Sequence, residues 1–294
     1  MLPGLWPPRD ELVPTSPRRH PDLAGVAHDA DPARTLPGRT LVKTLRDTWL
    51  IFERSIVLTL RNPVWLIFGL AQPFLYLVLF GPLLEKVVRA PGFPAGGAWN
   101  VFVPGLLIQI AMFGASFVGF GLIAELRYGV VERMRVTPMS RVAMLLGRSL
   151  RDVVFLCSQA VVLIVIAIPF GLAIDPGAIA VTLALLALIG LAMAPTSYAL
   201  ALWLKSEDAL APFLNSVVLP LLLLSGILLP MSLAPAWLQT LASLNPFEHT
   251  VEAARALFNG HWADPQILIG VAVSGLLAAG AIWLGSRAFS RAVA

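Results

Sequence analysis

Charge is missing from six long stretches of this 294-residue sequence, and none of them contains Asp, Glu, Lys, Arg or His. Hydrophobic residues make up 57% of the chain and charged residues only 13%. A helix rises about 1.5 Å per residue, so roughly 20 apolar residues cross the hydrocarbon core of a membrane. We therefore predict an all-α polytopic membrane protein with six spans, at about residues 64–84, 101–124, 153–174, 178–204, 211–229 and 267–285.

Motifs of catalytic and ATP-binding sites are also absent. The sequence has no HExxH metalloprotease motif, no GxSxG nucleophile elbow and no GxxxxGK[ST] phosphate-binding loop. Ionisable residues inside a membrane usually mark proton relays or ion paths, and the predicted spans hold none. We therefore expect that the chain is not an enzyme and that its energy source lies in another subunit.

Cysteine is almost absent too. The single Cys157 falls inside the third predicted span, which excludes a disulfide framework and is typical of a small buried apolar residue.

The first forty residues contain no apolar run that resembles a signal peptide. Residues 1–39 are instead rich in proline and mixed charge, which predicts a disordered cytoplasmic tail ahead of a membrane domain at 40–294.

Lysine and arginine are distributed very unevenly among the loops. Eighteen lie before the first span, between spans two and three, after span four or after span six, against three in the other loops. The positive-inside rule then places both termini in the cytoplasm.

In residues 40–62 apolar residues recur at three- and four-residue steps with charged residues between them, which predicts an amphipathic helix on the inner leaflet. A solvated helix packed on a neighbouring domain is the alternative.

Helix breakers mark positions with a structural or gating role. Proline inside a membrane helix removes a hydrogen bond and tends to kink the axis, either as a hinge or as a static bend.

The residue pattern of the loop between spans five and six predicts two short outer-surface helices, near residues 235–244 and 250–258, separated by a break at Asn245-Pro246. The residues that we single out are Pro73, Pro220, Ser225, Gly226, Pro230, Asn245 and Pro246.

Glu248, His249 and Glu252 in this outer loop form a weak candidate for a metal site. The motif lacks a second histidine at a ligating spacing, so we expect no metal and no other cofactor in this chain. An intramembrane enzyme that acts on lipid with these three residues stays open as an alternative.

Residues 125–141 read ELRYGVVERMRVTPMSR and resemble the loop between spans two and three of the type-2 ABC exporter permeases. Arg61-Asn-Pro-Val-Trp, Gln72-Pro-Phe-Leu-Tyr, Pro235-Ala-Trp-Leu and Leu244-Asn-Pro-Phe resemble the daunorubicin/doxorubicin-resistance branch more narrowly. The resemblance covers about residues 41–294.

The resemblance implies the membrane subunit of an ATP-driven exporter. It implies six spans, an N-terminal interface helix and a coupling helix near residues 129–140 that contacts a separate ATPase. Two ABC ATPase subunits, carrying ATP and Mg²⁺, and a second permease, identical or paralogous, would complete the assembly. The residues that the resemblance assigns to ATPase coupling are Arg127, Glu132, Arg133, Arg135, Thr137 and Pro138.

Uncharged spans favour a hydrophobic or amphipathic cargo, and the resemblance implies a drug, antibiotic or lipid exported across a bacterial cytoplasmic (inner) membrane. Besides the bilayer and this small substrate, we expect no nucleic-acid partner. A permease for a lipid-linked polysaccharide and a self-contained secondary transporter are the remaining alternatives.

Overall fold

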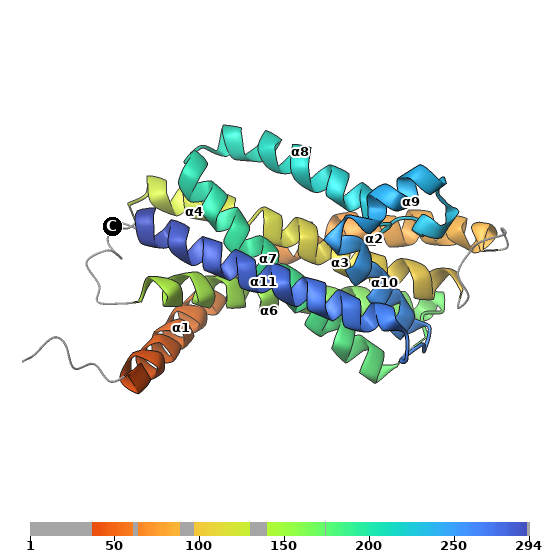
Figure 1. Ribbon diagram of the computed structural model, residues 1–294, viewed down its shortest axis with the longest axis horizontal. Coiled ribbons are helices and arrows are strands. Elements are labelled where there is room, and N and C mark those ends of the chain that lie inside the picture. Colours follow the sequence, from red (N-terminus) through yellow and green to blue (C-terminus); the bar gives the residue numbers. More distant parts are fainter. Residues whose placement is uncertain (1–36, 61–63, 89–96, 130–139, 174, 293–294) are drawn as a thin grey trace, which may run out of the picture. The chain divides into compact units, whose positions relative to one another are not determined.

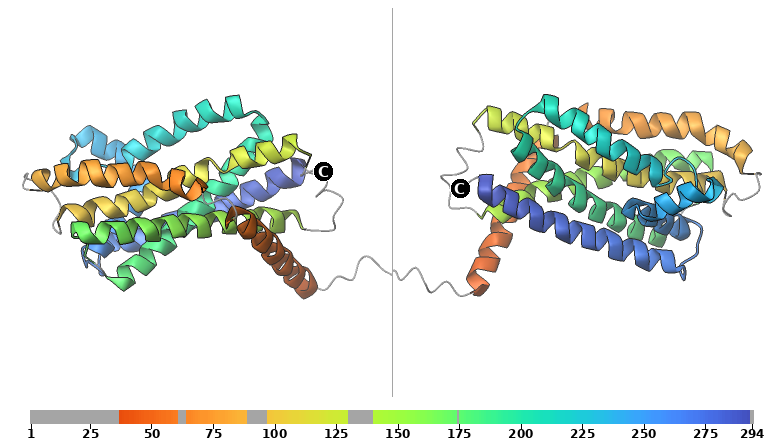
Figure 2. Two further views of the ribbon diagram at one scale, coloured as in Figure 1. Left: turned by 180° about the vertical axis from the view of Figure 1, so that it is seen from behind. Right: turned by 45° about the horizontal axis from the view of Figure 1, so that its top comes forward.

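The computed structural model describes residues 37–60, 64–88, 97–129, 140–173 and 175–292. Every regular element in these ranges is a helix, as predicted. Long helices run side by side, with the short helices α9 and α10 at one end and the last turn of α11 at the other (Figures 1 and 2). The packed helices belong to the unit Leu41–Ala294.

Six long apolar elements correspond to the six predicted spans. They are α2 (Val64–Val87), α3 (Ala98–Ser116) continued by α4 (Gly119–Arg127), α6 (Arg141–Ala167), α7 (Pro176–Leu204), α8 (Glu207–Leu224) and α11 (Pro265–Ala292). Among the described residues, five segments are long and apolar enough to cross a membrane: Ala98–Arg127, Val142–Phe170, Pro176–Leu204, Glu207–Leu224 and Pro265–Arg291. A multi-pass membrane protein is therefore confirmed. The sixth span, on α2, stays a prediction.

α3 and α7 form the centre of the packing. Almost every residue of α3 is buried, and the helix contacts α2, α6, α7, α8 and α10. α7 contacts α3, α4, α6, α8, α10 and α11. Close approach needs small residues here: a Cβ at Gly105 would lie 2.5 Å from the Ile227 carbonyl oxygen, and one at Gly119 would lie 2.7 Å from the Ser197 carbonyl oxygen.

Polar side chains begin several of the helices. Ser140 caps α6 by accepting the Ala143 amide at 3.3 Å, and Asp175 caps α7 by accepting the Gly177 amide at 2.9 Å. These caps satisfy amide groups that have no partner inside the helix. α6 ends at Ala167 and is followed by the short 3₁₀ turn η2 (Ile168–Phe170), which contains Pro169.

The connection between α8 and α11 contains the two predicted short helices, and the second of them starts earlier in the chain than residue 250. It holds the 3₁₀ turn η3 (Met231–Leu233), α9 (Ala236–Ser243) and α10 (Pro246–Phe258). Asn245-Pro246 starts α10 rather than merely breaking the chain, because the Asn245 side chain accepts the Phe247 amide at 3.1 Å and Pro246 occupies the first turn. α10 packs against α3, α7 and α11, and most of its residues are buried.

α1 (Pro37–Leu60) corresponds to the predicted amphipathic helix. It contacts α6 at Gly147, where an added Cβ would lie 2.8 Å from the Thr48 carbonyl oxygen and from the Ile51 Cβ. Leu45 and Trp49 are exposed on it, which suits a helix that meets lipid or another protein.

Candidate functional site

A buried charged cluster joins α1, α6 and α7. Asp152, on α6, accepts a hydrogen bond from the Tyr198 hydroxyl of α7 at 2.5 Å and an ion pair from Arg151 Nη2 at 2.7 Å. Arg151 also donates to the Tyr198 hydroxyl at 3.3 Å and to Thr59 Oγ1 of α1 at 3.2 Å. Both Asp152 and Tyr198 are almost fully buried. One arginine and one carboxylate therefore hold three helices together.

This cluster lies on the helix that carries the third predicted span. α6 begins at Arg141, ahead of the predicted span at 153–174, so Arg148, Arg151 and Asp152 belong to the same continuous helix as the apolar run. The absence of charge holds for residues 153–174 but not for the helix. An ionisable group buried in a membrane helix is a functional candidate by default, because isolating it from water is costly unless it has partners.

A second set of ion pairs ties α4 to its neighbours. The guanidinium of Arg148, a buried residue of α6, contacts the Glu125 carboxylate of α4. Arg127, in the last turn of α4, lies 3.4 Å from Glu207 at the start of α8, and both of these side chains are solvent-accessible. The exposed pair contributes little to stability, whereas the Arg148 contact fixes α4 against α6.

These contacts flank the predicted coupling segment. Arg127 is the one proposed coupling residue that the structure describes; Glu132, Arg133, Arg135, Thr137 and Pro138 lie outside the described residues. On the other flank, the Ser140 amide donates to Asp47 Oδ2 of α1 at 3.4 Å. Residues 130–139 thus begin and end on helices that are tied to α1, α6 and α8.

At the opposite end of the helices, Arg255 of α10 forms a buried clamp. Its Nε donates to the Val101 carbonyl of α3 at 3.0 Å, its Nη2 to the Gly226 carbonyl at 2.6 Å, and its Nη1 to Glu252 at 2.7 Å. Burial lowers the pKa of Arg255, and the Glu252 carboxylate opposes that shift. The planar fork of the guanidinium lets one side chain hold α10, α3 and the turn after α8 together.

The structure brings several of the predicted gating residues to this clamp. Ser225 donates to the Leu222 carbonyl at 2.6 Å, and Gly226 has a φ of 70°, a backbone conformation that favours glycine. Asn245 Nδ2 donates to the Leu221 carbonyl at 2.7 Å, which links the start of α10 to the end of α8. Two prolines of the set are close to this turn in the sequence: Pro230 is buried just after it, and Pro246 starts α10. The other two lie within long helices, Pro220 exposed in α8 and Pro73 buried in α2.

The acidic residues of α10 are engaged with other groups. Glu252 pairs with Arg255, Glu248 lies 3.4 Å from the His249 ring, and the His249 Nε2 lies 3.1 Å from the Ser243 carbonyl oxygen. Among the described residues, no group of three His, Cys, Asp or Glu side chains is arranged to hold a metal ion. Burial, followed by repulsion from Glu252, raises the pKa of Glu248.

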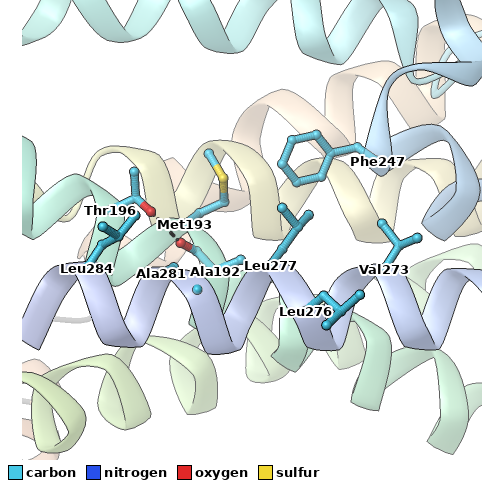
Figure 3. A pocket seen from close by; sticks show the side chains of 10 residues that line it. Ala192, Met193, Thr196, Phe247, Val273, Leu276, Leu277, Ala281 and Leu284 are labelled. Carbon is cyan, nitrogen blue, oxygen red and sulfur yellow. Dashed lines mark hydrogen bonds between the residues drawn. The ribbon is translucent and has the colours of Figure 1, made fainter.

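An apolar groove of about 420 Å³ runs between α7, α10 and α11 (Figure 3). Thr196 is the sole polar residue among those lining it, and its hydroxyl donates to the Ala192 carbonyl of its own helix at 2.8 Å. The groove walls therefore offer packing but no free hydrogen-bonding side chain. They consist of Ala192, Met193, Thr196, Phe247, Val273, Leu276, Leu277, Gly280, Ala281 and Leu284.

Three features of these sites were not predicted from the sequence: the buried Asp152, its partner Tyr198 and the clamp role of Arg255. One signal was present: Arg151 and Asp152 come three and four residues after Arg148, directly before an apolar run, so each of them neighbours Arg148 on the helix surface. Their partners are remote in sequence, and nothing local distinguishes Tyr198 from the other polar residues of its span.

Comparison with known proteins gives one family. The sequence profile of the family described as ABC-2 type transporter matches residues 46–259. The match includes the charged cluster, the predicted coupling segment and all of α10.

Among relatives, the chain is 28% identical over 217 residues to the transport permease ycf38 of Cyanophora paradoxa, covering 73% of this chain and 75% of that protein. It is 29% identical over 229 residues to ycf38 of Pyropia yezoensis, with 75% and 77% covered. It is 21% identical over 230 residues to the doxorubicin resistance ABC transporter permease protein DrrC of Mycobacterium tuberculosis, with 78% and 79% covered. These identities do not single out the drug-export branch.

Proposed function

This chain belongs to the ABC-2 type transporter family, and from that membership we propose that it is the permease of an exporter powered by a separate ATPase. The observation that carries the proposal is the family match over residues 46–259, which coincides with a helical chain rich in candidate membrane spans. The cargo that we propose is a hydrophobic or amphipathic compound, namely a drug, an antibiotic or a lipid.

The charged cluster supports a route for coupling. Residues 129–140 would form the coupling helix. α4 precedes this segment in the chain, and α6 follows it. The Arg148–Glu125 contact makes α4 move with α6, and the Asp152–Tyr198–Arg151 contacts make α6 move with α7 and α1. A displacement at the ATPase would therefore reach several membrane helices as a rigid-body motion.

A complete transporter in this proposal contains two ABC ATPase subunits, which bind ATP and Mg²⁺, and a second permease. Exposed apolar residues on α2 and α8 support the pairing, because such faces require lipid or a protein partner. They include Leu75, Leu79 and Leu83 of α2 and Val217, Leu219 and Leu223 of α8.

We place the protein in a bacterial cytoplasmic membrane with both termini in the cytoplasm. The excess of Lys and Arg in the N-terminal segment and in the loop between α4 and α6 supports this orientation. α1 would then lie at the inner leaflet as an interface helix, ahead of a membrane domain that ends with α11.

Asp152 favours a second candidate function, a proton-coupled secondary transporter. It is a buried carboxylate in a membrane helix, the kind of group that relays protons in pumps. Against this role, Asp152 is already bonded to Arg151 and Tyr198, which leaves it paired rather than poised to exchange protons.

Affinity purification of the chain from its native membranes in mild detergent tests the assembly. We expect mass spectrometry to identify a soluble ATPase with a P-loop in roughly stoichiometric amount, together with any paralogous permease. Recovery of the chain alone, still active in transport, would favour the secondary transporter.

A further inference from the structure

The groove between α7, α10 and α11 has the length and lining of a site for a lipid chain. Its residues on α11 extend from Val273 to Leu284, which corresponds to about 16 Å along a helix axis. One leaflet of a bilayer contributes about 15 Å of hydrocarbon. Leu276 and Leu284 on the rim are 75% and 59% exposed, so the groove opens to the surroundings of the helices rather than to the packed core.

The groove is open to its surroundings at Gly280. This residue is exposed, and a Cβ built there would meet no heavy atom within 4 Å. The volume of about 420 Å³ is within the range of ligand sites, and the walls reward only apolar contact. An extended hydrocarbon chain is the occupant that these walls fit.

Positive charge follows the groove on the same helix. Arg287 and Arg291 come three and seven residues after Leu284, which places them on the face of α11 that lines the groove. Both arginines are exposed, and the Arg287 guanidinium lies 3.8 Å from the centroid of the Trp283 ring. A basic cluster at the end of an apolar groove is complementary to an anionic phospholipid headgroup.

We propose that this groove binds one anionic phospholipid, with an acyl chain along α11 between Val273 and Leu284 and the phosphate at Arg287 and Arg291. The site requires neither ATP nor an ATPase, so it stands or falls separately from the proposed function. It gives the basic end of α11 a ligand in addition to its role in topology.

Photo-crosslinking of the purified full chain tests the proposal. The probes are phosphatidylglycerol and phosphatidylcholine that carry the same diazirine-labelled acyl chain, and the labelled peptides are identified by mass spectrometry. We expect phosphatidylglycerol to label peptides of α7 and α11 that line the groove, in preference to phosphatidylcholine. Equal labelling by the two lipids would overturn the proposal of an anionic-lipid site.

Gly280→Leu and Gly275→Leu form a matched pair for the acyl chain. Both glycines lie on α11 with open space around the missing side chain, but only Gly280 lines the groove. We expect Gly280→Leu to abolish groove labelling and Gly275→Leu to preserve it, with both variants eluting as the wild type does in size exclusion. Similar labelling in the two variants would contradict the assignment.

Arg287→Gln/Arg291→Gln tests the headgroup independently of packing. Near a membrane surface each arginine changes anionic-lipid affinity about fivefold, so labelling by phosphatidylglycerol is expected to fall to the level of phosphatidylcholine. Lys86→Gln, in the last turn of α2, removes a positive charge away from the groove and should leave labelling unchanged. The outcome that overturns the proposal is a cargo site. In that case a hydrophobic dye would block labelling by phosphatidylglycerol equally in the wild type and in the double variant.

Discussion

At the residue scale, the Asp152–Tyr198 contact is a buried hydrogen bond to a charged acceptor. We expect Tyr198→Phe to lower the free energy of unfolding by about 1.5–3 kcal/mol, because Asp152 loses a donor that water does not replace. Thermal unfolding in detergent measures the change. Tyr128→Phe is the matched control, since Tyr128 is 76% exposed, and an equal loss in both variants would contradict the account.

Arg255 is the second residue whose removal leaves buried groups without a partner. Arg255→Met removes the ion pair with Glu252 and takes this donor away from the carbonyls of Val101 and Gly226 in a buried environment, and we expect a loss of about 3–5 kcal/mol. Arg255→Lys should recover only part of this, because an ammonium does not reproduce the guanidinium fork. Full recovery of the unfolding temperature with lysine would show that charge alone matters.

Glu248 makes a pH-dependent contribution that opposes folding. Burial, followed by repulsion from Glu252, raises the pKa of Glu248 in the folded protein, so the folded state holds the proton more tightly than the unfolded state. Between the usual glutamate pKa and this raised value, stability therefore falls as pH rises. We expect Glu248→Gln to flatten that part of the stability profile, measured by thermal unfolding from pH 4 to 7.

The exposed Glu53 of α1 supplies the control for this profile. Glu53→Gln removes one exposed carboxylate far from α10 in the sequence and is measured over the same pH interval. A profile of Glu248→Gln that matches the wild type across the same interval would show that Glu248 titrates alike in the folded and unfolded states.

At the element scale, the segment between α4 and α6 is where ATPase motion would enter. We expect Glu132→Lys/Arg133→Glu to reduce transport strongly while membrane insertion and expression stay unchanged, because charged contacts with the partner would be reversed. The same Glu-Arg pair occurs at Glu53-Arg54 on α1, and its reversal is the matched control. Efflux assays at equal expression compare the two. Unchanged efflux in the first variant would remove the coupling role.

How much of the fold could be predicted differs between elements. Long apolar runs locate α2, α3, α7, α8 and α11 well, because a run that needs lipid around it is visible in sequence. The burial of Arg148 and Asp152 on α6 was not predicted, because both look like loop residues until their partners are known. Glu125 and Tyr198 are those partners, and they lie 23 and 46 residues away.

α10 shows the same limit for the candidate site. Glu248, His249, Glu252 and Arg255 suggest a polar outer helix, yet α10 packs on α3, α7 and α11 and buries its arginine. The buried side chain is satisfied by carbonyls from α3 and from the turn after α8. Backbone carbonyl acceptors cannot be identified from the residue types around them, because every residue carries a carbonyl group.

At the scale of the whole molecule, the two ends of the helices should face opposite sides of the membrane. The chain has one cysteine, Cys157, so Cys157→Ala provides a background for single reporter cysteines. We expect Gln239→Cys, exposed on α9, to react with a membrane-impermeant maleimide in intact cells. Ala294→Cys should react only after permeabilisation, and the reverse pattern would invert the proposed orientation.

The central claim is that transport by this chain is driven by ATP hydrolysis in a partner. The most direct measurement is uptake of a hydrophobic fluorescent substrate into proteoliposomes that contain the chain with or without its copurified ATPase, under ATP or under an imposed proton gradient. We expect uptake only when the ATPase and ATP are both present. Uptake driven by the proton gradient in vesicles without the ATPase, and abolished by Asp152→Asn, would contradict it.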